Sequence, residues 1–351
     1  MPAPLTARGL AVRLGLLATA LVAALLICSS IGSSGYTVFD LFRPAGGPLG
    51  PLGDPESSGA GLAAAMILQV RLPRLLLAAI AGGALASAGA VFQAVLRNPL
   101  ADPYILGISG GAALGAIAAT AAGLDALLPF LPVRPTAAFA GALGTVAFII
   151  VLSSVRGRIA SYPMLLIGVV TNAIYLALIL FIETVVDFTR IQGVMLWMVG
   201  NITTEAYRTI VMVAAILIAG IVPLTLMGRD LNLLSAGEDV ARSLGVTVER
   251  TRITAVVLAS LITAAVVSVA GLIGFVGLIV PHVTRLVFGP DHRLLIPASA
   301  LSGAIFLMVA DTAARTILAP TELPVGVITA LCGGPFFLWL YRAQRGVTYF
   351  E

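Results

Sequence analysis

Three arginines at the ends of apolar segments could bind carboxylates. Arg71 and Arg74 flank Pro73 at the start of one long apolar run, and Arg315 ends another run, one turn after Asp311. Because a guanidinium pairs with a carboxylate through two parallel hydrogen bonds, such a group could capture an acidic surface of a soluble partner. Snorkelling to lipid headgroups is the alternative for arginine at a helix end, and spacing alone favours it.

A stiff polar hairpin at residues 97–103 joins the next two apolar runs. Its sequence, Arg-Asn-Pro-Leu-Ala-Asp-Pro, contains two prolines, and Asp102 could cap the helix that follows. A simple turn that starts a helix is one interpretation. The other is a rigid plug at the mouth of a pore, with the short turn at Ser161, Tyr162 and Pro163 as its counterpart.

The loop 228–252 predicts a short amphipathic helix outside the membrane. Ser235 could cap this helix together with Glu238 three residues later, and Gly245 could end it. Such a helix could lie on the membrane surface, or it could insert into a groove of a cytoplasmic protein.

The sequence carries no pattern for catalysis or metal binding. It contains no phosphate-binding loop, no HExxH motif and no nucleophile elbow, so any ATP hydrolysis must come from another chain. His282 and His292 have no second ligand at metal spacing, and we expect Cys28 and Cys332 to be buried, unpaired thiols. We therefore expect no catalytic residue, no metal site and no bound cofactor. The arginines form no basic run, which argues against nucleic acid as a partner.

The composition indicates a membrane protein built from helices. Of 351 residues, 59% are apolar and 10% are charged, whereas a soluble domain carries about 25% charged residues. Since a helix needs about 20 apolar residues to cross a bilayer, we interpret the whole chain, 1–351, as one all-α transmembrane domain with ten segments. These cover roughly 12–32, 72–95, 104–122, 136–155, 163–184, 207–227, 253–272, 275–289, 294–318 and 325–342.

Arginine placement predicts the orientation. Ten crossings put both termini on one side, and with the N-terminus inside, thirteen arginines fall on the cytoplasmic side and seven outside. The loop 33–70, rich in glycine, proline and serine, would then be a long, irregular outer loop, and 228–252 would be cytoplasmic. The apolar run after Arg13 is long for a signal peptide, so we expect a retained first helix.

Small and polar residues inside the segments predict how the helices meet. Gly107, Gly111 and Gly115 share one helix face, which lets two backbones approach closely. Asn172 and Tyr175 lie at membrane depth and should therefore face protein or a water-filled cavity.

Five motifs, in order along the chain, resemble the FecCD family, the permease subunits of bacterial ABC importers for iron-siderophores, heme and vitamin B12. The resemblance extends from about residue 62 to the C-terminus, and the outer loop is the part it covers least. The motifs are RLPR at 71–74, QAVLRNPLADPYILGISGGAALG at 93–115, AGEDVARSLGV at 236–246, GLIGFVGLIVPHVTRLVFGPDHR at 271–293 and ELPVGVITALCGGPFFLWL at 322–340.

The resemblance implies a type II ABC importer permease-like fold with ten helices in each subunit. It implies a homodimer in the bacterial inner membrane, two cytoplasmic ATPase subunits that hold ATP and Mg, and one periplasmic binding protein. It also assigns roles to residues by position. These are docking of the binding protein for Arg71, Arg74 and Arg315; a coupling helix seated on the ATPase for Gly237, Glu238, Ala241, Arg242, Leu244 and Gly245; cytoplasmic gates for Asn98, Leu100, Ser161 and Tyr162; and pore lining for Asn172 and Tyr175.

The mechanism that the resemblance implies is alternating access, without covalent chemistry on this chain. The polarity of the translocation path indicates the class of substrate. The path has few charges and no cluster of oxygen or sulfur ligands, so a bare metal ion is not expected. An apolar path suits a bulky chelate, with heme first, a ferric siderophore second and cobalamin third. The alternative class, an ion-coupled secondary transporter, would need a carboxylate at mid-membrane, whereas Asp311 and Glu183 lie towards the outer ends.

Overall fold

The computed structural model describes residues 6–32, 64–128, 130–155, 158–159, 161–186 and 188–344. Most of the predicted outer loop, residues 33–63, lies outside this part of the chain. The described chain is helical apart from two paired two-residue strands, β1 (Ser154–Val155) and β2 (Arg158–Ile159). The helices are α1 (Ala7–Ser30), η3 (Met66–Arg71), α3 (Leu72–Val95), α4 (Ile108–Ala121), α5 (Leu124–Leu127), α6 (Val133–Ser153), α7 (Ser161–Val185), α8 (Phe188–Met198), α9 (Tyr207–Leu226), α10 (Gly228–Ala236), α11 (Glu238–Ser243), α12 (Val248–Ala270), α13 (Val276–Phe288), α14 (His292–Thr316) and α15 (Val325–Gln344).

Each of the ten predicted apolar segments coincides with one helix. Seven helices in the described part of the chain are long and apolar enough to cross a membrane: α1, α3 with η3, α6, α7, α9, α12 and α14. The other three segments correspond to the shorter apolar helices α4, α13 and α15. The all-helical class is therefore confirmed, while ten crossings remain a prediction.

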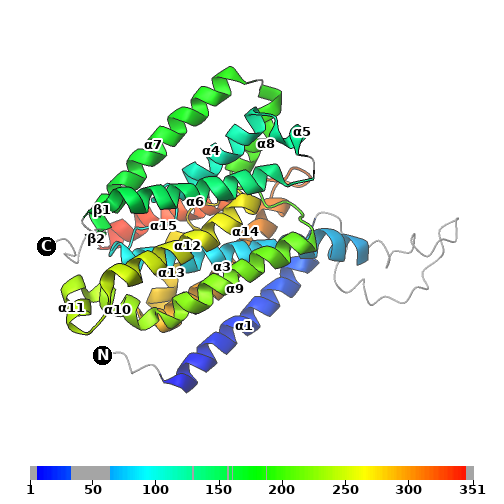
Figure 1. The fold of residues 1–351 in the computed structure, drawn as a ribbon. Coiled ribbons are helices and arrows are strands. Elements are labelled where there is room, and N and C mark those ends of the chain that lie inside the picture. Colours follow the sequence, from blue (N-terminus) through cyan, green and yellow to red (C-terminus); the bar gives the residue numbers. More distant parts are fainter. Residues whose placement is uncertain are drawn as a thin grey trace, which may run out of the picture.

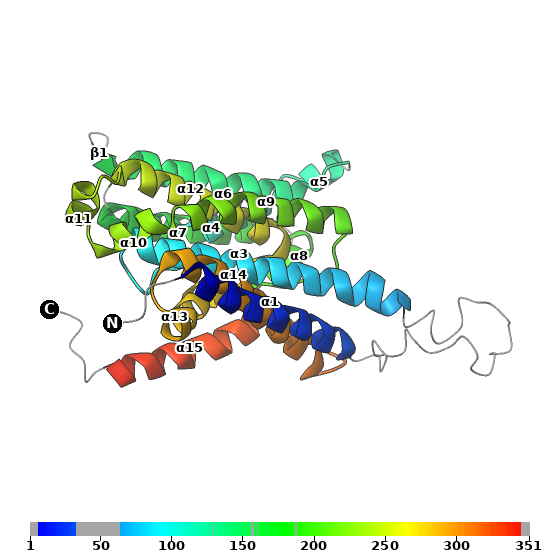
Figure 2. The ribbon, with the colours of Figure 1, turned by 90° about the horizontal axis from the view of Figure 1, so that it is seen from below.

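Helix α3 forms the centre of the bundle (Figures 1 and 2), where α14, α12, α13 and α9 pack around it. Its alanines and glycines are buried almost throughout, because small side chains let neighbouring backbones come close where lipid supplies no hydrophobic drive. A Cβ on Gly82 would meet the carbonyl of Gly303 in α14, and a Cβ on Gly89 would meet that of Gly277 in α13. The predicted small face of α4 is confirmed in the same way, since Gly111 packs on α6 at the Gly141 carbonyl.

Two long helices lie at the periphery of the bundle (Figure 1). Helix α1 packs mainly on α14 and exposes Leu16 and Leu26, and α7 exposes Ile174 and Phe181 along its length. A soluble monomer rarely exposes apolar faces of this size. In this chain they suit lipid or another membrane subunit.

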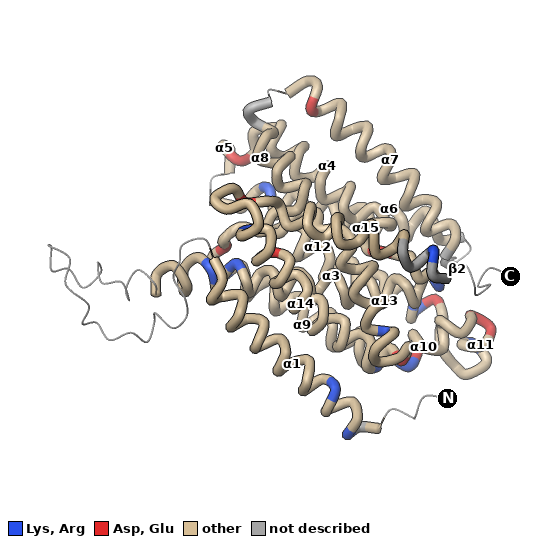
Figure 3. The backbone as a smooth tube through the Cα atoms, turned by 180° about the vertical axis from the view of Figure 1, so that it is seen from behind, with Lys and Arg blue, Asp and Glu red and all other residues tan. Residues whose placement is uncertain are grey.

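The charged residues gather at the two ends of the bundle and leave its middle apolar (Figure 3). The start of α1, the end of α15, and helices α10 and α11 lie at one end, which we name the α11 end. The start of α3, the end of α14 and helix α8 lie at the opposite end, which we name the arginine end. The two predicted interaction surfaces are thus separated by the length of the bundle.

Candidate functional site

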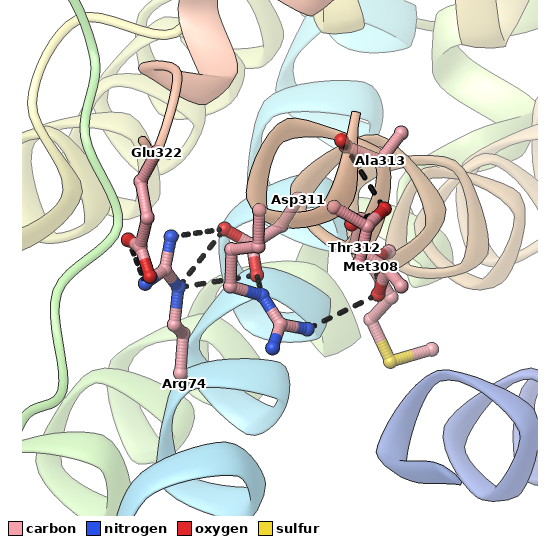
Figure 4. Close-up of polar contacts among 8 residues, drawn as sticks. Arg74, Met308, Asp311, Thr312, Ala313 and Glu322 are labelled. Carbon is pink, nitrogen blue, oxygen red and sulfur yellow. Dashed lines mark hydrogen bonds and ion pairs between the residues drawn. The ribbon is translucent and has the colours of Figure 1, made fainter. Parts of the chain in front are cut away.

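At the arginine end, Arg74 lies between two carboxylates from different parts of the chain (Figure 4). Its Nε donates to Asp311 Oδ1 at 3.1 Å, and its Nη1 donates to Glu322 Oε2 at 2.7 Å. Arg315 donates from Nε to the other oxygen of Asp311 at 3.1 Å. Asp311 is fully buried, whereas about half of the Glu322 side chain is exposed. Glu322 is therefore the part of this network that a soluble partner can reach directly.

The third predicted docking residue, Arg71, is buried and joins α1 to the same end. Its Nη1 donates to the Ser29 carbonyl at 2.9 Å, in the last turn of α1, where free carbonyls favour a cation. The structure thus brings Arg71, Arg74 and Arg315 to one end, but with little exposed surface. Their pairing with a partner's glutamates remains a prediction.

Glu322 is the residue that sequence reasoning missed in this cluster. Its position was visible at the start of the motif ELPVG, just after Pro320 and Thr321. An acid at the end of a turn looks solvated, and only the folded chain brings it beside Arg74, 248 positions away.

At the α11 end, the hairpin 97–103 is held by its own side chains. Arg97 adopts a left-handed backbone with φ of 50°, and Asn98 Oδ1 accepts from the Leu100 amide at 2.9 Å. Asp102 Oδ1 accepts from the Tyr104 amide at 2.8 Å, so Asp102 caps a local turn. Its predicted capping of α4 is wrong, because Gly107, with φ of 73°, occupies that position. Burial raises the pKa of the Asp102 carboxyl to about 6, although the Tyr104 amide lowers it.

The residues predicted to line the pore connect helix α7 to the rest of the bundle. Asn172 Nδ2 donates to the Tyr104 carbonyl at 3.0 Å, and the Tyr175 hydroxyl lies 3.0 Å from the Thr145 hydroxyl of α6. The Tyr104 hydroxyl in turn donates to the Ile273 carbonyl at 3.0 Å. The hairpin, α7 and the α12–α13 connection therefore form one hydrogen-bonded unit.

Two of the predicted gate residues are exposed in the single chain. Leu100 is 52% exposed and Tyr162 is 76% exposed. Ser161 is the first residue of α7, and its side chain lies outside the described part. Exposed large side chains such as Leu100 and Tyr162 suit a contact with another subunit.

The predicted amphipathic helix exists as α11, which ends as the sequence indicates. Gly245 has φ of 86°, its amide donates to the Arg242 carbonyl, and the Val246 amide donates to the Ala241 carbonyl at 2.9 Å. These two bonds form a Schellman motif. The predicted capping box is wrong, because Ser235 belongs to α10 and its hydroxyl donates to the Leu231 carbonyl.

Ion pairs join α11 to the start of α12. Arg242 contacts Glu249 at 2.8 Å and Glu238 at 3.5 Å, and the buried Arg252 also pairs with Glu238. Ala241 is fully buried, whereas Leu244 is 60% exposed. One face of α11 is thus fixed to the bundle, and Leu244, directly after the helix, presents an apolar side chain to solvent.

Within the ranges that the structure describes, no three His, Cys, Asp or Glu side chains gather as a metal site would require. Cys28 is buried and free, as predicted. Cys332 is also free, but its predicted burial is wrong, because α15 lies at the edge of the bundle and exposes it.

Comparison with known proteins places this geometry in a family. A model of the FecCD transport family matches residues 17–343. The cobalamin import permease BtuC of Halobacterium salinarum is 45% identical over 79% of this chain and 73% of its own length. The hemin transport permease HmuU of Yersinia pestis is 41% identical over 79% of this chain and 83% of its own length.

The fold is also similar to a solved structure, "an inward-facing conformation of a putative metal-chelate type ABC transporter". The TM-score is 0.79 at 28% identity, over 95% of this chain and 99% of that one. Its described ranges contain seven apolar helices of spanning length, and the chain is a multi-pass membrane protein and a member of the FecCD transport family.

Proposed function

We propose that this chain is the membrane-spanning subunit of an ATP-driven importer that carries an iron chelate, heme first, from the periplasm to the cytoplasm. Its relatives are named as permeases for cobalamin and for hemin, at 45% and 41% identity. Both ligands are large metal chelates built on macrocycles, which supports a metal chelate as the substrate, and hemin contains iron. Heme is our choice within the class because a flat, largely apolar ligand suits a path with few charges.

The observation that carries the proposal is the construction of α11. A short helix that is buried on one side, exposed at Leu244 on the other and ion-paired to α12 suits a lever for a cytoplasmic ATPase. Force applied to α11 would pass through Arg252 and Glu238 into α12 and then into the core around α3. ATP and Mg would belong to the ATPase, and this chain would perform no covalent chemistry.

Transport would proceed by alternating access in a homodimer of the inner membrane, with N- and C-termini in the cytoplasm. A second copy would cover the exposed Leu100 and Tyr162, so that the two hairpins could close the path together. Large exposed apolar side chains near the α11 end support this arrangement.

Docking of a periplasmic binding protein would take place at the arginine end. A carboxylate from that protein would compete with Glu322 for Arg74, because this is the exposed contact of the network. Asp311 would stay in place and hold both Arg74 and Arg315 in orientation.

The test is uptake into proteoliposomes that contain this chain, its ATPase and its binding protein. We expect heme uptake that needs ATP and stops when the ATPase carries a substitution of its phosphate-loop lysine. Uptake by the chain without the ATPase, driven by an ion gradient, would overturn the proposal in favour of a secondary transporter. ATP-dependent uptake of cobalamin or a ferric siderophore, without heme, would overturn only the choice of substrate.

A further inference from the structure

A basic cavity of about 1190 Å³ opens at the α11 end, where α1, α3, α10, α13 and α14 meet. Its lining contains one acidic side chain, Asp291, whose carboxylate already accepts from Asn232 and Arg293. The cationic side chains outnumber it: Arg13, Arg97, Arg285 and Arg293 all line the cavity. The balance of charge therefore favours an anionic ligand.

Three of these arginines form no ion pair with any residue in the described ranges. Arg13 donates to the Phe288 carbonyl at 3.2 Å, and Arg285 donates to Gln93 Oε1 at 2.8 Å. Both partners are neutral, so neither compensates the positive charge. Arg285 is partly buried, whereas Arg13 and Arg97 are exposed. Guanidiniums that no carboxylate pairs with attract an anion.

A buried ring nitrogen also lacks a partner in this lining. His292 is 5% exposed, and its Nδ1 lies 2.7 Å from Asn232 Oδ1. Its Nε2 is buried and makes no hydrogen bond within the described chain. A buried polar atom in this situation is best satisfied by a ligand or by water.

The position of the cavity indicates what kind of anion it takes. Arg13 is the last charged residue before the apolar length of α1, which sets the cavity at the level of the lipid headgroups. Two exposed apolar side chains of α13, Leu286 and Val287, line the cavity, and the exposed Leu16 follows Arg13 on α1 by three residues. A free anion would gain nothing from these surfaces, whereas the acyl chains of a lipid would cover them.

We propose that this cavity binds the headgroup of an anionic phospholipid. Arg13, Arg97 and Arg285 would hold the phosphate, and the acyl chains would lie along the exposed faces of α1 and α13. A basic pocket between membrane helices is a known setting for anionic headgroups. The inference goes beyond the proposed transport function and does not depend on it. The lipid would anchor the otherwise peripheral α1 to α13 and α14.

The test measures lipid binding to the purified, delipidated full-length chain by native mass spectrometry. The probes are short-chain phosphatidylglycerol, short-chain phosphatidylcholine, inorganic phosphate and a polyglutamate peptide. We expect one phosphatidylglycerol per chain, held more tightly than phosphatidylcholine and not displaced by millimolar phosphate. The Arg13→Gln/Arg97→Gln variant should weaken binding about 5-fold for each arginine removed, hence about 25-fold. Both side chains are exposed, so the variant should still fold.

The matched control is Arg229→Gln/Arg250→Gln, which removes two exposed arginines that do not line the cavity. This control should bind phosphatidylglycerol as the unmodified chain does. Equal affinity for both lipids, or equal weakening by both double variants, would overturn the proposal. Displacement of the lipid by phosphate alone would point to a free anion. Displacement by a polyglutamate peptide would point to an acidic segment of a protein, and either result would also overturn it.

Discussion

Asp311 is a fully buried carboxylate that holds two guanidiniums, those of Arg74 and Arg315. Asp311→Asn would remove the carboxylate that Arg315 pairs with and leave Arg74 only its pair with Glu322. Breaking a buried pair in this way costs about 3–5 kcal/mol of stability. Glu322→Gln removes a half-exposed partner and should cost about 1 kcal/mol or less. Denaturant unfolding of the two variants in detergent measures this difference. Equal losses would show that Asp311 does not organise the cluster.

Asp291 caps α14 and gives a pH-dependent contribution to stability. The Arg293 guanidinium, hydrogen-bonded to Asp291, holds the pKa of that carboxyl at about 2, below its ordinary value of 3.8. A lowered pKa stabilises the fold above pH 3.8, and the contribution is lost as the pH falls through about 2. Asp291→Ala should therefore cost about 1 kcal/mol at pH 5 and at pH 8. The difference in melting temperature between the unmodified chain and Asp291→Ala should become smaller below pH 4. A difference of the same size at pH 2.5 would contradict this.

Residue types indicated the ends of the bundle more reliably than they indicated contacts. Arg71, Arg74 and Arg315 are at one end as expected, because charge avoids the apolar interior. The burial of Arg71 and Arg74 was not predictable, since Arg71 bonds to the Ser29 carbonyl and Arg74 to Asp311 and Glu322, which are distant from them in sequence. The predicted capping hydrogen bond of Ser235 was wrong for a local reason. Helix α10 extends as far as Ala236, so the Ser235 hydroxyl donates to a carbonyl within that helix.

The close approach of neighbouring helices can be tested by adding a single methyl group at a glycine. A Cβ on Gly89 would collide with the backbone carbonyl of Gly277, whereas a Cβ on Gly144 meets nothing within 4 Å. Gly89→Ala must therefore move α3 away from α13 and should lower stability by about 1–3 kcal/mol. Gly144→Ala is the matched control and should be neutral or slightly stabilising, since alanine favours the helix. Thermal unfolding that ranks the two variants the other way would contradict this packing.

Substitutions in α11 and directly after it can test packing against the bundle and contact with a partner separately. Leu244→Asp changes an exposed side chain, so we expect unchanged stability of the chain but weaker association with the ATPase, by about 10-fold. Ala241→Trp enlarges a fully buried residue and should displace α11 from the bundle, which would uncouple ATP hydrolysis from uptake. Co-purification of the ATPase measures the first effect, and the ratio of ATP hydrolysed to substrate moved measures the second. Normal coupling in Ala241→Trp would rule out the lever role.

Hydropathy located the long helices, because a segment in lipid needs apolar side chains and must satisfy its own backbone hydrogen bonds as a helix. It did not indicate which of them form the core. Helix α3 and helix α7 are similarly apolar, yet 83% of the α3 span is buried inside the bundle and only 17% of the α7 span. The difference comes from alanine and glycine at the contacts of α3, and small residues reveal burial only when their partners are known.

At the scale of the whole molecule, the arginine end and the α11 end are connected through α3, which begins beside Arg74 and ends at the hairpin 97–103. A signal from a docked binding protein would therefore act on the same helix that α12 contacts from the other side. In the free chain, Glu322 already pairs with Arg74, so the docking proposed above would be an exchange of carboxylates rather than a simple addition.

This exchange predicts an unusual sign for one substitution. Glu322→Gln removes an acid from the proposed docking surface and frees the Arg74 Nη1 group to pair with a partner's carboxylate. Affinity for the binding protein should therefore rise by about 2- to 5-fold. Arg74→Gln should lower the affinity for the binding protein. This decrease should be smaller at high salt, because the lost ion pair is partly exposed. Surface plasmon resonance with the chain in nanodiscs measures both. Unchanged affinity in Glu322→Gln would mean that Arg74 does not exchange its partner, and the docking surface would then lie elsewhere at the arginine end.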